Sequence, residues 1–334
     1  MDQRDDLLTI LGTEIPAAYH LGAIRPLRYL ENTHQRRHKK IVVESEKGKY
    51  LAKTYTNDAV TLDSLYFQHN LSNFLYSHDL PVAQILRTHA GKSFIAKDNW
   101  AVELQSFLSG GPIPLTVQTL KVAGSCLGKF HSVCRGLPSP PRDARKWRFS
   151  EVPRAIFQDF YQRVLQERND AQMHGFCDTI VAFLGEATEE LAQEKRDTFE
   201  TGIIHGDWHG GNLLFVNEEI QGIIDLEYAG DGCYLEDLSY GLSNLCLRAS
   251  VDAQKLENRT DIYLAAYEQH RSLSWGERVA LFYAAGIKHI TTVAFQHPAA
   301  DGKVAGATPV QWLATLAEQT KWLARQAHNA RWGN

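Results

Sequence analysis

The sequence lacks the features of several common classes of protein. No apolar run approaches the roughly 20 residues that a transmembrane helix needs, so we expect no membrane partner. Residues 1–6 are mostly charged and acidic, without the basic start and apolar stretch of a secretory signal. The cysteines are odd in number, widely spaced and without a CxxC pair, which argues against a disulfide framework or a zinc site: Cys126, Cys134, Cys177, Cys233 and Cys246. We therefore predict reduced thiols and a cytoplasmic location.

The chain also lacks an excess of charge of one sign. Its 35 Lys and Arg residues face 39 Asp and Glu residues, which gives a net charge of −4. This balance argues against a dedicated nucleic-acid or anionic-membrane binder. The contents of 44% hydrophobic and 22% charged residues are typical of a globular protein. At roughly 100–200 residues per domain, the length suggests two domains.

The first third of the chain has the pattern of short strands around one helix. Runs 41–44 and 50–55 are rich in strand-forming residues, and the charged, glycine-containing segment between them predicts a hairpin. Asp58 or Thr61 can cap a helix that should end near residues 77–79, before Pro81. Two further strands are expected at 82–86 and 100–107.

The pattern becomes mainly helical after a Gly- and Pro-rich loop at 109–114. Within the helical part, residues 202–232 contain two short strand-like runs, 213–216 and 220–224. We therefore predict an α+β fold with a small β-rich N-terminal lobe, a hinge at about 103–111, and a larger helical lobe with an embedded β-ribbon. The predicted domains are 1–108 and 109–334. Helices are predicted at 117–133, 153–170, 175–195, 257–272, 275–295 and 308–328.

Polar residues with a distinctive spacing surround this ribbon. Residues 205–212 have the pattern H-x-D-x4-N, formed by His205, Asp207 and Asn212, and Asp225 follows 13 positions after Asn212. Phosphoryl transfer to an alcohol needs such a set, because one carboxylate accepts the hydroxyl proton while an amide oxygen and a second carboxylate hold Mg²⁺. Any one of these residues alone would be read as a turn cap, but the whole set points to a kinase.

A lysine in the N-terminal part completes the pattern. Lys53 lies in the otherwise apolar run 50–55, where it must meet either solvent or an anion. Kinase-like folds use a strand lysine at such a place to bind nucleotide phosphates.

Together these segments resemble the aminoglycoside phosphotransferase/choline kinase superfamily, which are small-molecule kinases with a bilobal protein-kinase-like fold. Residues 127–133, 205–215, 223–230 and 236–239 carry the resemblance, together with Lys53. It implies ATP and Mg²⁺ as cofactors, with GTP as the alternative nucleotide, and a small-molecule alcohol as the acceptor. The sequence carries no signal of the oligomeric state.

The resemblance also implies roles for individual residues. Asp207 would be the catalytic base, Asn212 and Asp225 the metal ligands, and Lys53 the phosphate-binding lysine. Adenine would hydrogen-bond backbone groups near 103–108, with Gln105 and Phe107 as the predicted contacts. The roles implied for the neighbouring residues are structural: His205 would brace the catalytic loop, and Asp237 would bind backbone N–H groups or cap a helix at 238–247.

The acceptor is the least determined part of this interpretation. Acidic residues cluster after Asp225, namely Glu227, Asp231, Glu236 and Asp237. With Tyr228 they favour an amine-bearing acceptor such as an aminoglycoside, choline, ethanolamine or a homoserine-like amino acid. His209 and Trp208 lie in the catalytic loop and either approach the acceptor or only pack the loop.

Some features depart from the kinase pattern. The helix after Lys53 offers Gln68 where a glutamate normally pairs with the lysine, and no G-x-G-x-x-G or Ala-Pro-Glu is present. These absences disfavour a protein substrate, and an atypical protein Ser/Thr kinase is kept as an alternative. Gln68 is the feature that favours the other alternative, a nucleotide-binding pseudokinase. The basic run 34–40 can lean over nucleotide phosphates or form a solvated hairpin tip.

Overall fold

The computed structural model of the chain describes residues 3–31, 38–138, 151–248, 250–296 and 306–333. The N-terminal part contains a five-stranded antiparallel sheet in the order β1-β2-β3-β5-β4. The strands are β1 (Arg28–Tyr29), β2 (Lys40–Ser45), β3 (Gly48–Thr56), β4 (Phe94–Lys97) and β5 (Trp100–Ser106). The predicted hairpin is confirmed, because β2 and β3 pair from Ser45 and Gly48 onward.

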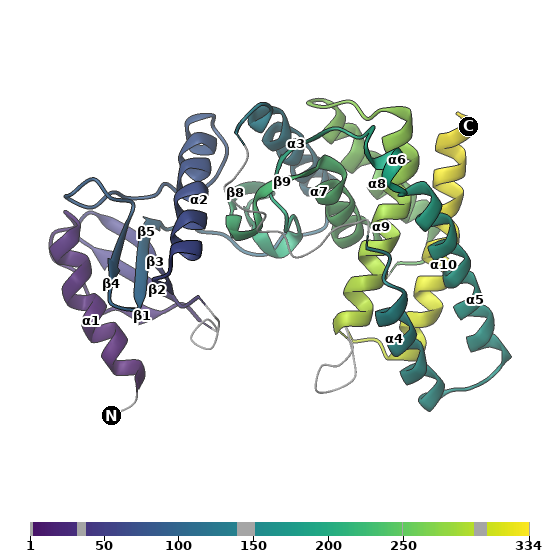
Figure 1. Cartoon of the computed structure of the whole chain (residues 1–334), viewed down its shortest axis with the longest axis horizontal. Coiled ribbons are helices and arrows are strands. Elements are labelled where there is room, and N and C mark those ends of the chain that lie inside the picture. Colours follow the sequence, from purple (N-terminus) through teal and green to yellow (C-terminus); the bar gives the residue numbers. More distant parts are fainter. Residues whose placement is uncertain (1–2, 32–37, 139–150, 249, 297–305, 334) are drawn as a thin grey trace.

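Two helices cover the two faces of this sheet (Figure 1). Helix α1 (Gln3–Ala18) packs Leu11 and Ile15 against one face. Helix α2 (Ala59–Ser77) packs Leu65 on the other, and the Asp58 carboxylate accepts the Thr61 N–H to cap it. The sequence pattern predicted α2 and its end correctly, but α1 was not predicted.

The alternation of side chains along the strands brings charged residues together on the α2 face. Ala52 packs with the α1 side, so its neighbour Lys53 points to the opposite face. The directly opposed partners of Lys53 are Lys40 on β2 and Glu103 on β5. Because directly opposed residues in a sheet share a face, Lys40, Lys53 and Glu103 form a row across three strands.

The C-terminal part is mainly helical, as predicted, and ends far from the N-terminal sheet (Figure 1). Its long helices fall within a few residues of the predicted ranges. They are α3 (Val117–Cys134), α4 (Arg154–Glu167), α5 (Ala171–Glu190), α8 (Ala253–Glu268), α9 (Trp275–Gln296) and α10 (Pro309–Trp332), with the shorter α6 (Gln193–Arg196) and α7 (Tyr234–Gly241). No helix in the described ranges is long and apolar enough to cross a membrane.

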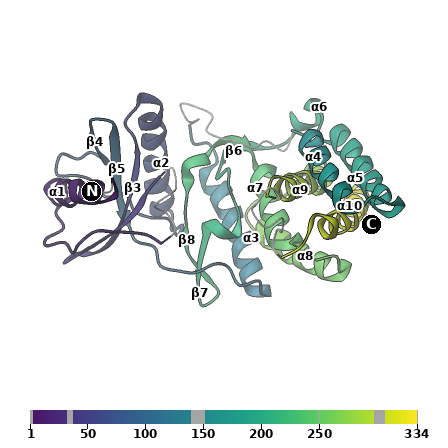
Figure 2. The ribbon, with the colours of Figure 1, turned by 90° about the horizontal axis from the view of Figure 1, so that it is seen from below.

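The predicted ribbon is present, and a second one accompanies it. Strands β7 (Leu213–Val216) and β8 (Glu219–Ile223) pair with each other, as do β6 (Thr201–Ile204) and β9 (Gly230–Cys233). The β7–β8 ribbon lies between α2 and α3 (Figure 2). It therefore stands next to the N-terminal part, and the loops between these strands lie where the two parts of the chain meet.

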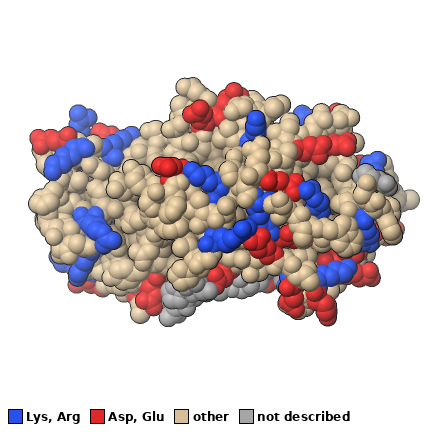
Figure 3. All heavy atoms as spheres, turned by 90° about the horizontal axis from the view of Figure 1, so that it is seen from above, with Lys and Arg blue, Asp and Glu red and all other residues tan. Residues whose placement is uncertain are grey.

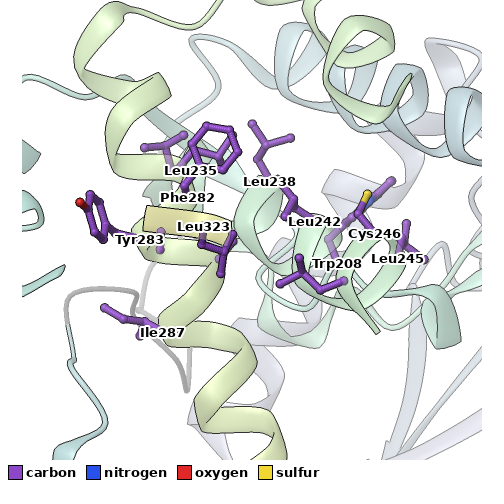
Figure 4. Packing of buried hydrophobic residues seen from close by; sticks show 14 of the residues in the cluster. Trp208, Leu235, Leu238, Leu242, Leu245, Cys246, Phe282, Tyr283, Ile287 and Leu323 are labelled. Atoms are coloured by element: carbon purple, nitrogen blue, oxygen red, sulfur yellow. The ribbon is translucent and has the colours of Figure 1, made fainter. Parts of the chain in front are cut away.

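One large hydrophobic core holds the C-terminal part together. Trp208, in the loop after β6, packs in a cluster with side chains of α7, α9, α10 and the π-helical turn η3 (Leu242–Leu247) (Figure 4). Trp208 is fully buried, so it packs the loop and does not approach an acceptor. Charged side chains of both signs alternate over the face seen in Figure 3.

Two sequence predictions need correction. Residues 82–86 form no strand and make only single bridges, from Val82 to Ile223 and from Ile85 to Gln105. The edge strand that pairs with β5 on the side away from β3 is β4, which follows residues 82–86 in the chain. The helix predicted at 238–247 begins earlier, as α7, and continues as the π-helical η3.

Candidate active site

The loop that carries Asp207 connects β6 to a 3₁₀ turn, η1 (Gly210–Asn212). Gly206, directly before Asp207, has a φ of 78°, and a Cβ at this position would clash with the carbonyl oxygen of Tyr228. Only glycine fits this backbone at low cost. The sequence His205-Gly206-Asp207 therefore folds as a tight turn that presents the Asp207 carboxylate.

Asp237 of α7 holds this turn in place through hydrogen bonds to its backbone. Its carboxylate accepts the N–H of His205 at 2.6 Å and the N–H of Gly206 at 2.8 Å. The ring of His131 also contacts it, with 3.2 Å between Nε2 and Oδ2. The predicted backbone hydrogen bonds are thus present, whereas the alternative of a helix cap is wrong because Asp237 lies inside α7.

His205 links the turn to the segment that carries Asp225. Its Nδ1 accepts the N–H of Asp207 at 3.2 Å, so the ring proton belongs on Nε2. Nε2 then donates to the carbonyl oxygen of Ile224 at 3.0 Å. The imidazole is fully buried and fixes the Asp207 and Asp225 segments relative to each other.

Asp207 and Asn212 face each other across η1. The Asn212 amide nitrogen donates to the Asp207 carboxylate at 2.9 Å and to its backbone carbonyl at 3.0 Å. His209 lies on the other side, with Nε2 at 3.4 Å from Oδ2 of Asp207. Burial opposes ionisation of Asp207, but His209, His205 and the Asn212 hydrogen bond outweigh it and lower the pKa of the carboxyl. Asp207 is therefore ionised at neutral pH.

Asp225 follows β8 in the left-handed backbone region, with φ 61° and ψ 59°. This conformation is uncommon for a non-glycine residue and is often found at functional sites. Lys40 Nζ lies 2.9 Å from both carboxylate oxygens, and Lys53 Nζ lies 3.2 Å from one of them. Burial opposes ionisation, but the two lysine charges hold the pKa of Asp225 well below its usual range.

Besides Asp225, a second carboxylate attracts Lys53, and it comes from β5 and not from α2. Glu103, directly opposite on β5, is buried and interacts electrostatically with Lys53. Helix α2 contributes His69, whose Nε2 lies 2.5 Å from the Glu103 carboxylate and whose Nδ1 contacts Ser93 at 2.8 Å. Burial opposes ionisation of Glu103, but His69 and Lys53 lower its pKa. The carboxylate beside Lys53 thus comes from β5 and is oriented by α2.

A pocket between the sheet and the β7–β8 ribbon contains several predicted residues. Lys53, Gln68, Gln105 and Asp225 all line it, together with Glu103. Phe107 interacts elsewhere, because the Lys49 ammonium lies 3.9 Å above its ring.

The predicted acceptor residues fall in different places. Glu227 and Tyr228 lie on η2 (Leu226–Tyr228), directly after Asp225. Glu227 lies 3.5 Å from the ring of His38 in the N-terminal part. His209 caps η1, since its Nδ1 accepts the N–H of Gly211 at 3.0 Å. His209 also lies beside Asp207, with 3.4 Å between its Nε2 and the carboxylate oxygen Oδ2.

Three residues of this site were missed by sequence reasoning: Lys40, His69 and Glu103. Lys40 ends the basic run 34–40, of which residues 34–37 lie outside the described residues. The hairpin pattern could have found it, because the five-residue connection 45–49 already placed Lys40 near Lys53. Nothing in the local sequence marks His69 or Glu103.

The chain is similar to known phosphotransferases. The APH family model, described as a phosphotransferase enzyme family, matches residues 31–274. A homoserine kinase from Nitrobacter hamburgensis is 25% identical over 228 residues, which are 66% of this chain and 64% of the relative. The chain thus aligns with slightly less than two thirds of that relative's length.

Solved structures share the fold. An aminoglycoside phosphotransferase from Alicyclobacillus acidocaldarius superposes with a TM-score of 0.69 at 17% identity, covering 95% of this chain and 94% of that one. An amicoumacin kinase in complex with AMP-PNP and Ca²⁺ gives a TM-score of 0.65 at 16% identity, covering 100% and 94%. These likenesses confirm the bilobal α+β kinase-like fold. Because the family model matches well over half of the chain, this protein belongs to the APH phosphotransferase family and is one of its kinases.

Proposed function

We propose that this kinase transfers the γ-phosphoryl group of ATP to the hydroxyl of a small, amine-bearing molecule. The observation that carries the proposal is the pairing of Asp207 with Asn212 at 2.9 Å, linked through His205 to Asp225. Asp225 in turn lies 3.2 Å from Lys53. A proton acceptor, two oxygen ligands and a phosphate-binding cation are the groups that phosphoryl transfer requires.

The nucleotide binds between the predicted domains 1–108 and 109–334, with the hinge at 103–111. Lys53 positions the phosphates, while Gln68 and Gln105 line the pocket beside it. Backbone groups near 103–108 contact the adenine, whereas Phe107, whose ring meets the Lys49 ammonium, does not line the pocket. The complex of the amicoumacin kinase with AMP-PNP supports an adenine nucleotide, since the two chains share their fold.

The residues present fit a magnesium ion held jointly with the nucleotide. The Asn212 amide nitrogen donates to Asp207, which directs its oxygen elsewhere, and the Asp225 carboxylate already attracts two ammonium groups. No group of three His, Cys, Asp or Glu side chains in the described ranges could hold a metal ion. Two hard oxygen ligands suit Mg²⁺, which takes its remaining ligands from phosphates and water. Bound there, Mg²⁺ would neutralise charge on the phosphates.

Asp207 acts as the general base. It accepts the proton of the acceptor hydroxyl while the hydroxyl oxygen forms a bond to the γ-phosphorus. The bond from this phosphorus to the oxygen bridging the β- and γ-phosphates breaks, and ADP leaves. Its lowered pKa keeps Asp207 ready to accept a proton at neutral pH, and His205 and Asp237 hold it in position.

An amine-bearing acceptor is supported by the relatives, which are named for homoserine, aminoglycosides and amicoumacin. His209, Glu227 and Tyr228 are the proposed acceptor contacts. The alternatives are an atypical protein kinase and a pseudokinase that binds nucleotide as an interaction module. The complete set of Lys53, Asp207, Asn212 and Asp225 disfavours the pseudokinase.

The test is an assay of ADP release with MgATP and a panel of hydroxyl acceptors, comprising aminoglycosides, choline, ethanolamine and homoserine. Release that depends on an acceptor, and that is lost in Asp207→Asn, would support the transferase. Phosphate incorporated into added protein substrates would favour the protein kinase. Nucleotide binding without transfer to any acceptor or protein would favour the interaction module.

A further inference from the structure

A cationic and aromatic group stands beside Asp207 on the side of the C-terminal helices. The Tyr240 ring of α7 lies 5.3 Å, centroid to centroid, from the ring of His209. The Lys288 ammonium of α9 lies 3.7 Å from the centroid of the same Tyr240 ring. Burial and the nearby Asp207 charge both raise the pKa of Tyr240, so the tyrosine connects Asp207 to Lys288.

The core fixes the position of this lysine. Its neighbour Ile287 packs with Leu323 and Tyr283 in the cluster of Figure 4. Lys288 itself is 9% exposed. Burial lowers its pKa to about 8, while the charges of Asp207 and Asp237 act in the opposite direction. The ammonium is therefore held in a partly desolvated place close to the catalytic carboxylate.

Two of the four acidic residues that favoured a cationic acceptor, Glu227 and Asp237, have other contacts. Glu227 faces His38 of the N-terminal part, and both carboxylate oxygens of Asp237 are bound by the backbone of the catalytic turn. On the C-terminal side of Asp207 lie His209, Tyr240 and Lys288. This side of the site therefore favours a negative group on the acceptor.

We propose that the acceptor carries a carboxylate in addition to its hydroxyl, and that Lys288, supported by the Tyr240 ring, binds this carboxylate. The inference rests on the proposed function, because it places the acceptor hydroxyl at Asp207. A single ammonium matches the single charge of a carboxylate, whereas phosphate groups are usually met by several donors or by arginine. The expected acceptor is a hydroxy acid or hydroxy amino acid.

Three compounds with a primary hydroxyl separate the possibilities. Homoserine carries an amine and a carboxylate, 4-hydroxybutanoate carries only the carboxylate, and 3-amino-1-propanol carries only the amine. Their binding to the ADP-bound enzyme is measured by calorimetry, which requires no turnover. The two carboxylates should bind, and 3-amino-1-propanol should bind at least tenfold more weakly than homoserine.

Variants assign the effect to Lys288. Lys288→Met keeps the apolar stem and should weaken carboxylate binding about 10- to 100-fold, the range of a charge-assisted hydrogen bond. It should leave the affinity for 3-amino-1-propanol unchanged. Lys288→Arg should restore part of the loss. Lys255→Met, on the exposed surface of α8, is the matched control, and thermal unfolding checks that each variant folds.

Several outcomes would overturn the proposal. These are a failure of both carboxylates to bind, equal carboxylate binding by the wild type and Lys288→Met, or Lys288-dependent binding of inorganic phosphate but of neither carboxylate. The proposed function fails separately, if no hydroxyl compound or protein gives acceptor-dependent ADP release that Asp207→Asn abolishes. Turnover of homoserine in Lys288→Met with an undiminished rate and an unchanged KM would contradict the carboxylate contact and leave the transferase intact.

Discussion

Asp207 and Asp225 of the candidate active site meet different partners on its two sides. Asp225 faces the N-terminal sheet, where Lys40 and Lys53 lie 2.9 and 3.2 Å from its carboxylate. Asp207 faces the C-terminal helices, where the amide of Asn212 donates at 2.9 Å and His209 lies at 3.4 Å. The Asp225 carboxylate is thus paired with two lysine charges, whereas the Asp207 carboxylate is held mainly by a neutral amide and a titratable imidazole.

This difference matches two kinds of chemistry. A carboxylate that attracts cations suits the binding of metal and phosphates, because such a site must balance several charges. A carboxylate held by hydrogen bonds keeps its capacity to accept a proton. The sheet side should therefore govern nucleotide affinity, and the helical side should govern the chemical step and the choice of acceptor.

The largest effect is expected on the helical side. Asp207→Asn keeps the size of the side chain and an oxygen for the Asn212 amide, but removes the base. The turnover number should fall about 10²- to 10⁴-fold, while the KM for ATP changes less than about threefold if the nucleotide binds on the sheet side. Steady-state kinetics of ADP release checks this, and a loss below tenfold would contradict the assignment of Asp207 as base.

A smaller effect is expected from Lys53 on the sheet side. Lys53→Met removes a charge-assisted contact and should lower kcat/KM for ATP about 10- to 100-fold. The KM for the acceptor should stay near the wild-type value. Lys47→Met, in the exposed turn after β2, is the control. If the acceptor KM rises as much as the ATP KM, the division between the two sides is wrong.

The partner of Lys53 allows a direct contrast between two candidate residues. Glu103→Gln removes the negative charge that attracts Lys53 and weakens the hydrogen bond with His69, and it should lower kcat/KM for ATP roughly tenfold. Gln68→Ala should change it less than about threefold, because a neutral side chain at the pocket wall holds no charge. Equal losses in both variants would mean that α2, as the sequence suggested, supports the lysine directly.

That contrast shows how far the sequence could predict the site. The spacing of Asp207, Asn212 and Asp225 was readable, because one short ribbon separates them along the chain. Helices such as α3 and α9 were readable from their apolar period of 3.6 residues. The role of Glu103 could not be predicted, because its place opposite Lys53 depends on the register between β3 and β5.

The position of Lys288 in the site could not be predicted from the sequence, for a similar reason. It lies 81 positions after Asp207 on a helix whose sequence shows only an apolar face. Its place beside Tyr240 follows from how α9 packs on α7, and no local pattern encodes that packing. Contacts within one hairpin or helix can be predicted from periodicity, whereas contacts between distant elements need the assembled core.

Among the charged residues of the sheet side, the smallest loss is expected from Lys40. Lys40→Met leaves Lys53 on Asp225, so kcat/KM for ATP should fall only about three- to tenfold, between the values for exposed and buried charge pairs. The double variant with Lys53→Met should lose more than the product of the single losses, because Asp225 then keeps neither lysine. Kinetics of the four proteins forms a double-mutant cycle. Strictly multiplicative losses would show that the two lysines act independently and do not share the Asp225 carboxylate.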